Sequence, residues 1–293
     1  MRPVFDWNLG TRVLQLGKRT LLMGVVNVTP DSFSDGGRHL QPEQAVAHAL
    51  QLLDDGADII DIGGQSTRPG AKTVAGKSSQ PVTAEQELDR ILPVITAVKK
   101  QRSQTIVSVD THKAAVAQAA VEAGAEIVND VSGFTWDAKM IRTLAELRCG
   151  VVLMHTRGRP EEWHAQTPAG DIVTLVKREL RDRADAALMG GIKRDHIVLD
   201  PGFGFGKNLE ENYPLLRRFD EFHSLRYPLV AGVSRKSFIG RAIARNGHDA
   251  LVSERLYGTL AAETVAIVKG AHIVRTHDVK AAVDAVQIAD LVV

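Results

Sequence analysis

The chain has 293 residues, 44% of them hydrophobic, and its 36 Lys and Arg nearly balance its 35 Asp and Glu. The formal net charge of +1 excludes charge-driven binding to nucleic acid or to a membrane surface as the default expectation. Cys149 is the single cysteine, which excludes a disulfide framework and predicts a reducing, cytoplasmic location. No stretch reaches the roughly 18 apolar residues that a membrane helix requires, so we expect a soluble globular protein.

The predicted elements begin with a β-hairpin in the first twenty residues, where apolar residues alternate around Asn8, Leu9 and Gly10. Eight short apolar runs follow, at residues 21–27, 58–62, 106–110, 126–129, 151–155, 197–200, 229–233 and 272–276. They are apolar throughout rather than alternating, which is typical of parallel strands that are buried on both faces.

Helices are predicted between these strands. Apolar residues three and four apart mark residues 42–55, 83–102, 113–123, 171–190 and 253–269. The 273 residues from Leu21 to the end, divided by eight, give about 34 per unit, the size of a βα repeat. The repeat predicts a single (β/α)8 barrel domain over residues 1–293, a TIM barrel, rather than an open doubly wound sheet. We expect the hairpin of residues 1–20 to plug its N-terminal end.

The residues that follow the strands form the active site in such a barrel. A group that can hydrogen-bond or carry charge follows every predicted strand: Asn27, Asp61, Asp110, Asn129, Asp130, His155, Asp200, and the runs 234–236 and 275–277. Together, these groups favour a functional site at the barrel mouth.

Each of these residues also has a structural interpretation. An Asp or Asn after a strand is often only the N-cap of the next helix. His155 taken alone is more typical of a structural histidine, and Arg157 and Arg159 are expected to be solvated. Met154 and Phe205 are expected to pack, although a residue that packs at a strand end can still line a pocket.

The glycine-rich run PGFGFGK at residues 201–207 has neither the Walker spacing nor the dinucleotide fingerprint. It does allow the backbone to approach a flat ligand beside Asp200, with Phe203 or Phe205 available to pack on an aromatic ring. The sequence has no metalloprotease motif, no serine-hydrolase motif and no cysteine-based nucleophile.

The charged residues at the barrel mouth indicate a ligand with two different ends. Several cationic donors suit a phosphorylated substrate: Arg68, Arg235, Lys236, Arg275 and His277. The acceptors Asp110, Asn129 and Asp200 suit a flat heterocycle that presents amino and ring N–H donors, such as a guanine-like or pterin-like ring. The site is therefore predicted to hold a heterocycle and an oligophosphate together.

Eight motifs carry a family resemblance over nearly the whole chain: MGVVNVTPDSFSDGG (23–37), DIGGQSTRPGA (61–71), VSVDT (107–111), VNDVSG (128–133), LMH (153–155), LDPGFGFGKN (199–208), VSRKSFIGR (233–241) and HIVRTHDVK (272–280). In these motifs the chain resembles the bacterial dihydropteroate synthases. The resemblance implies a pterin-binding (β/α)8 barrel that joins 6-hydroxymethyl-7,8-dihydropterin diphosphate to p-aminobenzoate and releases diphosphate in folate biosynthesis.

The resemblance also implies a role for each site residue. Asp110, Asn129, Asp200 and Lys236 would hold the pterin, with Met154 and Gly204 as further substrate contacts. Asn27 would be the protein's contact to Mg²⁺. The residues bordering p-aminobenzoate would be Thr67, Phe205 and Ser234. The expected catalytic residues are Arg68, Lys236, Arg275 and His277. Of these, Arg275 would stack against the ring and reach the phosphates, and Arg68 and His277 would help to position the diphosphate.

The chain departs from the family pattern at Gln65, where a glutamate is common, and a glutamine cannot supply a negative charge at this position. The loops 29–40 and 64–81 are expected to close over the diphosphate.

We expect small-molecule substrates and a homodimer, with residues 265–268 as an apolar contact. Two alternatives are a pterin-binding methyltransferase, which has no need for the cationic cluster, and an inactive binding protein that would have lost Arg68, Lys236 or Arg275.

Overall fold

The computed structural model describes residues 2–29, 40–65 and 82–293. Two strands form an N-terminal hairpin, β1 (Phe5–Asn8) and β2 (Val13–Leu16). Eight further strands follow: β3 (Leu21–Asn27), β4 (Ile59–Gly63), β5 (Ile106–Asp110), β6 (Ile127–Asp130), β7 (Gly150–Met154), β8 (Ile197–Asp200), β9 (Val230–Ala231) and β10 (Ile273–Thr276).

The eight strands form one parallel sheet in the order β8-β7-β6-β5-β4-β3-β10-β9. A parallel bridge between Leu199 and Leu229 links β8 to the residue just before β9, so the sheet is nearly closed into a barrel. The predicted (β/α)8 fold is confirmed. Only Val230 and Ala231 of the predicted strand 229–233 pair as a strand.

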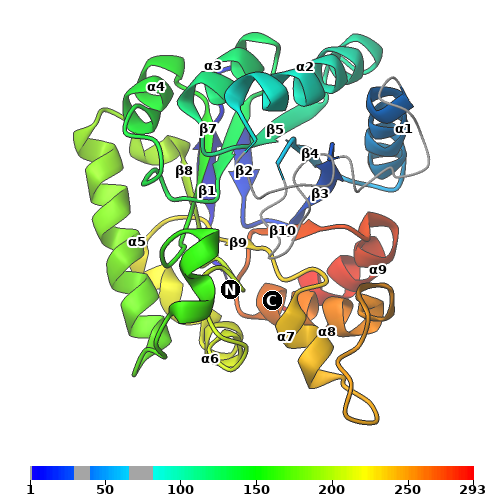
Figure 1. Cartoon of the computed structure of the whole chain (residues 1–293), viewed down its shortest axis with the longest axis vertical. Coiled ribbons are helices and arrows are strands. Elements are labelled where there is room, and N and C mark those ends of the chain that lie inside the picture. The colour runs from blue at the N-terminus through cyan, green and yellow to red at the C-terminus, as the bar shows by residue number, and fades with distance from the viewer. Residues whose placement is uncertain (1, 30–39, 66–81) are drawn as a thin grey trace.

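Helices surround this barrel (Figure 1). They are α1 (Leu40–Asp54), α2 (Ala84–Gln101), α3 (Ala114–Glu122), α4 (Met140–Leu147), α5 (Ile172–Met189), α6 (Asn212–Arg217), α7 (Ser237–Ala242), α8 (Leu256–Val268) and α9 (Val279–Asp290). The five predicted helices correspond to α1, α2, α3, α5 and α8, whereas the other four helices were not predicted.

The hairpin closes the N-terminal end of the barrel, as predicted. Its Trp7, Leu9 and Leu16 are completely or almost completely buried and pack against the first residues of the barrel strands. Trp7 Nε1 donates a hydrogen bond of 2.8 Å to the carbonyl oxygen of His196. A Cβ added at Gly150 would lie 2.4 Å from Leu9 Cδ2, so the hairpin lies directly against the start of β7. The opposite end of the barrel remains available for a site.

Within the described residues, no helix is both long and apolar enough to span a membrane.

Candidate active site

A cavity of about 290 Å³ opens at the carboxyl ends of the strands. Eleven predicted site residues line it: Asn27, Asp110, Asn129, Met154, Asp200, Gly204, Phe205, Ser234, Lys236, Arg275 and His277. Thr67 and Arg68 lie outside the described residues, as do most of the two loops expected to close. Residues from distant parts of the sequence therefore meet in one pocket because parallel strands end at the same edge of a barrel.

An ion-pair cluster involving Arg275 lies at the base of this pocket. Arg275 Nε donates to Asp61 Oδ2 at 2.7 Å, and Arg275 Nη2 donates to Asp110 Oδ2 at 2.9 Å. Asn129 Nδ2 donates to the same Asp61 oxygen at 3.0 Å. Asp61 is completely buried. The two acidic partners fix the orientation of the Arg275 side chain.

Two pocket carboxyl groups have perturbed acidities. Burial raises the pKa of Asp110 to about 7, although the neighbouring Arg275 opposes the shift. Burial also raises the pKa of Asp200, whose Oδ1 accepts a 2.7 Å hydrogen bond from the backbone N–H of Gly202. A carboxylate that has lost its water gains most from a ligand that brings N–H donors.

Ser234 and His277 form a second polar pair in the pocket. Ser234 Oγ lies 2.9 Å from His277 Nδ1 and accepts a hydrogen bond from the His277 backbone N–H at 3.2 Å. They stand at the ends of neighbouring strands, β9 and β10, which places a hydroxyl group and an imidazole side by side.

The cationic cluster differs from the one expected, because Arg235, although it lines the cavity, is already paired with a carboxylate. Its guanidinium binds Asp278 through two hydrogen bonds, of 2.9 Å and 2.5 Å. Arg235 also has a positive φ of 56°, which an L-residue adopts only when its surroundings hold it there. Since Arg275 is paired as well, the surplus positive charge at the pocket is smaller than the sequence indicated.

Three aromatic residues line the pocket, namely Phe205, Trp163 and the completely buried Phe203. Lys236 Nζ lies 4.0 Å from the centroid of the Phe205 ring, a cation–π geometry. Trp163, in the short helix Pro160–Ala165, meets Phe205 edge to face at 5.2 Å between centroids. Trp163 was not predicted as a site residue, because it lies well beyond the strand end in a segment without helical periodicity.

Three other residues after the strands have structural roles. Asp130 accepts hydrogen bonds from the backbone N–H groups of Ser132 and Phe134, at 2.7 and 3.1 Å, and so caps its own loop. His155 is completely buried, in keeping with the structural interpretation. The expectation for Arg157 was wrong, because its side chain is only 12% exposed and pairs with Glu211 at 3.2 Å.

Gln65 also lines the cavity, and its amide oxygen accepts a 2.6 Å hydrogen bond from Lys113 Nζ. Lys113 in turn forms an ion pair with the buried Glu87. The carboxylate that neutralises Lys113 is therefore Glu87, and Gln65 fulfils its contact with Lys113 as a neutral amide.

Asn27 lies in the cavity wall and offers an amide oxygen, a hard ligand of the kind Mg²⁺ accepts. Among the described residues, no group of three or more His, Cys, Asp or Glu could hold a metal ion by itself. Mg²⁺ usually takes one or two protein oxygens and completes its shell with water and substrate phosphate. The residues present thus fit a magnesium ion that arrives with a phosphorylated substrate.

Comparison with known proteins shows the family of the chain. A family model described as pterin binding enzyme matches residues 23–277. A dihydropteroate synthase of Synechocystis is 41% identical over 99% of this chain and 92% of its own length, and one of Escherichia coli K12 is 42% identical over 92% and 90%. The structure of Xanthomonas albilineans dihydropteroate synthase with 4-aminobenzoic acid has a TM-score of 0.86 and 42% identity, covering 100% of this chain and 98% of that one.

The barrel, the pocket and the matched model define a class, that of the pterin-binding enzymes. Within that class, the chain belongs to the dihydropteroate synthase family. It is accordingly a transferase of folate synthesis, which condenses 6-hydroxymethyl-7,8-dihydropterin diphosphate with p-aminobenzoate to give 7,8-dihydropteroate and diphosphate.

Proposed function

We propose that Asp110, Asn129, Asp200 and Lys236 hold the dihydropterin ring during this reaction. The carboxylate and amide oxygens would accept its amino and ring N–H groups. The observation that carries the proposal is that Asp110, which is partly buried, and Asp200, which is buried, both line the cavity, and that this burial raises the pKa of both carboxyl groups. A heterocycle with N–H donors would replace the hydrogen bonds to water that burial removed.

The diphosphate end is assigned to Arg275 and His277, together with Arg68 from the loop outside the described residues. Arg275 lines the cavity and is held rigidly by Asp61 and Asp110. A guanidinium fixed in advance would lose little entropy when it stacks on the ring and reaches a phosphate. Asn27 is the proposed protein ligand of Mg²⁺, an ion that would neutralise charge on the leaving diphosphate.

The p-aminobenzoate subsite is assigned to Phe205 and Ser234, with Thr67 from the same undescribed loop. Phe205 offers an aromatic surface beside Lys236, and Ser234 offers a hydroxyl group. The Xanthomonas albilineans enzyme has been solved with 4-aminobenzoic acid and with 7,8-dihydropteroate, which supports an aromatic amine next to the pterin.

The proposed chemistry is a displacement at the exocyclic methylene of the pterin. The bond from the methylene carbon to the arylamine nitrogen forms, the bond to the diphosphate oxygen breaks, and the amine loses a proton. The protein needs no nucleophile of its own, because binding holds the amine next to the methylene. Donors around the diphosphate stabilise the negative charge that grows there, and the acidic groups stabilise positive charge on the ring.

Calorimetric titration tests these assignments separately. The pterin diphosphate should bind more tightly with Mg²⁺ than without it, and Asn27→Ala should abolish most of that difference. Binding that is the same with and without Mg²⁺ would refute the metal assignment while leaving the pterin assignment standing.

We further propose a homodimer through an apolar face on α8 and α9, two helices that pack against each other (Figure 1). The exposed apolar side chains on these two helices are Tyr257 (82%), Val265 (42%), Val268 (50%) and Ile288 (67%), and Leu291 (82%) follows α9. Large apolar side chains exposed to water favour burial against a second copy. Sedimentation should give the dimer mass for the wild type and the monomer mass for Val265→Glu, and a wild-type monomer would refute the proposal.

A cytoplasmic location is proposed from the cysteine content. Cys149 is the only cysteine of the sequence and is buried, so no disulfide between two cysteines of the chain can form. Cell fractionation tests this location, and recovery of the protein outside the cytoplasm would refute it.

A further inference from the structure

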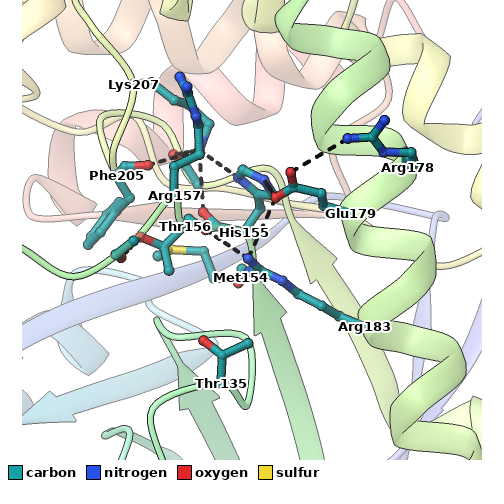
Figure 2. A network of polar contacts seen from close by, with 12 residues as sticks. Thr135, Met154, His155, Thr156, Arg157, Arg178, Glu179, Arg183, Phe205 and Lys207 are labelled. Atoms are coloured by element: carbon teal, nitrogen blue, oxygen red, sulfur yellow. Dashed lines mark hydrogen bonds and ion pairs between the residues drawn. The ribbon is translucent and has the colours of Figure 1, made fainter. Parts of the chain in front are cut away.

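Lys207 ends the glycine-rich loop, and the reaction described above does not use it. Its side chain is buried, at 7% exposure for the residue. Its Nζ lies 2.8 Å from the carbonyl oxygen of Gly202, 3.1 Å from that of Phe205 and 3.3 Å from that of His155. One nitrogen atom therefore ties two points of the loop to the residue that follows β7. Figure 2 shows Lys207 beside Phe205 and His155.

The fourth neighbour of Lys207 Nζ is His155 Nδ1, at 2.9 Å. The other ring nitrogen, Nε2, lies 3.0 Å from Glu179 Oε2 on α5. A carboxylate only accepts hydrogen bonds, so Nε2 carries the proton of the imidazole and Nδ1 offers its lone pair to Lys207. Burial lowers the pKa of His155 well below its ordinary range, which agrees with a neutral ring.

Lys207 Nζ thus faces four acceptors. Burial lowers the pKa of Lys207 well below its ordinary range, with Asp200 opposing the shift, but the ammonium form, with three hydrogens, satisfies more of these acceptors than a neutral amine does. Glu179 fixes the tautomer from the far side of the imidazole. Arg183, on the same helix, donates to the carbonyl oxygens of Met154 and Thr156 at 3.3 and 2.8 Å. Helix α5, the end of β7 and the glycine loop are therefore joined by one polar network (Figure 2).

The loop depends on this network for its shape. Gly202, Gly204 and Gly206 all have positive φ, between 64° and 77°, and glycine is the residue with the most freedom to leave such a conformation. A Cβ at Gly202 would lie 1.9 Å from the carbonyl oxygen of His155, so this loop lies directly against β7. The hydrogen bonds of Lys207 restrict the backbone flexibility that the three glycines introduce.

Phe205 stands between these glycines, and its ring contacts Lys236 and Trp163 in the pocket. We propose that Lys207 is a positioning residue, which through the His155–Glu179 pair fixes Phe205 as the wall of the p-aminobenzoate subsite and so sets affinity for the aromatic amine. This inference rests on the proposed assignment of Phe205 to that subsite.

Steady-state kinetics of Lys207→Met test the inference, with Lys177→Met as the matched control. Lys177 lies on α5 and pairs with Glu221 at 3.6 Å, away from the glycine loop. We expect Lys207→Met to raise the KM for p-aminobenzoate about tenfold, which corresponds to the net contribution of about one hydrogen bond. The KM for the pterin diphosphate should change less than about twofold. The control should match the wild type. Equal changes in both KM values, or none, would overturn the inference.

Glu179→Gln supplies a second variant in case Lys207→Met does not fold, because the Glu179 side chain is 32% exposed. It should raise the same KM in the same direction by about threefold, since the amide no longer fixes the tautomer of His155 as a carboxylate does. An unchanged KM for p-aminobenzoate in this variant would overturn the inference.

Hydrogen exchange of the peptide covering residues 201–207 separates this inference from the proposed function. We expect exchange in Lys207→Met to be at least about tenfold faster than in the wild type, and unchanged in Lys177→Met. If the wild type makes no dihydropteroate, the proposed function fails while this readout still tests the cross-link. Unchanged exchange with an active wild type overturns the inference alone.

Discussion

Arg275 and Asp61 form an ion pair beneath the pocket, with 2.7 Å between Arg275 Nε and Asp61 Oδ2. Asp61 is completely buried and is not part of the cavity lining in the described part of the chain. The same oxygen accepts a hydrogen bond from Asn129. Asp61 therefore holds two pocket side chains, Arg275 and Asn129, in position although it does not itself line the cavity.

Replacing Asp61 by Asn should destabilise the fold strongly. The Asp61→Asn variant leaves Arg275 paired with Asp110, and the charge-assisted hydrogen bond that it loses from a buried site costs about 1.5 to 3 kcal/mol. Urea unfolding measures this loss. Asp54→Asn is the control, because its pair with Arg102 is largely exposed, with side chains 55% and 44% accessible, and should contribute less than about 1 kcal/mol. Similar losses in the two variants would contradict the structural account.

Asp200→Ala should weaken binding of the pterin by about 2 to 4 kcal/mol, because a charge-assisted hydrogen bond to the ring would be lost. Asp200 is buried within the cavity wall, so its carboxylate has little water to return to when the ligand leaves. Calorimetry with a pterin that lacks the diphosphate isolates this end of the site. Wild-type affinity in the variant would remove Asp200 from the pterin subsite.

The hairpin plug should contribute stability but no catalysis. Trp7→Ala would leave a cavity where a completely buried side chain stood, at a cost of about 3 to 5 kcal/mol in the free energy of unfolding. Because Trp7 lies at the opposite end of the barrel from the pocket, both KM values should stay within about twofold of the wild type at a temperature where the variant is folded. A selective change in one KM would show that the two ends are coupled.

Glu263 should make the stability of the protein depend on pH. Burial raises the pKa of this carboxyl group from 4.5 to about 8, against the opposing effect of the Thr276 hydroxyl. The folded state therefore favours the protonated form, and the free energy of unfolding falls as the pH rises from about 4 through about 8. Glu263→Gln removes the loss of stability that comes from ionising this buried carboxyl group.

The measurement is the difference in unfolding free energy between Glu263→Gln and the wild type across pH. The variant should be more stable by about 2 to 4 kcal/mol at about pH 9 and nearly equal to the wild type at about pH 4. A variant that is less stable at the higher pH would mean that the Glu263 carboxylate is favourably paired.

The sequence predicted the barrel well because strands such as β5 and β8 are continuous apolar runs, and both have the predicted ends. It was less informative about helices such as α4 and α6, which have only 8 and 6 residues. Short helices give too few turns for a periodic pattern to stand out. Strand β9 has only two residues, and Gly232, directly after Ala231, already lines the cavity.

The sequence predicted which residues form the candidate site, but not which of them pair with one another. Asp110 and Arg275 were both expected at the pocket, yet nothing in the sequence showed that they would pair with each other. Arg157 was wrongly expected to be solvated, because its partner Glu211 lies far along the chain. Ion pairs between distant segments depend on tertiary packing, which residue spacing does not specify.

Turnover by the purified chain tests whether it acts as a dihydropteroate synthase. The protein is supplied with Mg²⁺, 6-hydroxymethyl-7,8-dihydropterin diphosphate and p-aminobenzoate, and both products are quantified, in parallel with Arg275→Ala. We predict that the wild type forms dihydropteroate and diphosphate in equal amounts and that Arg275→Ala loses most of this activity. Absence of dihydropteroate from the wild type, or release of diphosphate without it, would contradict the account.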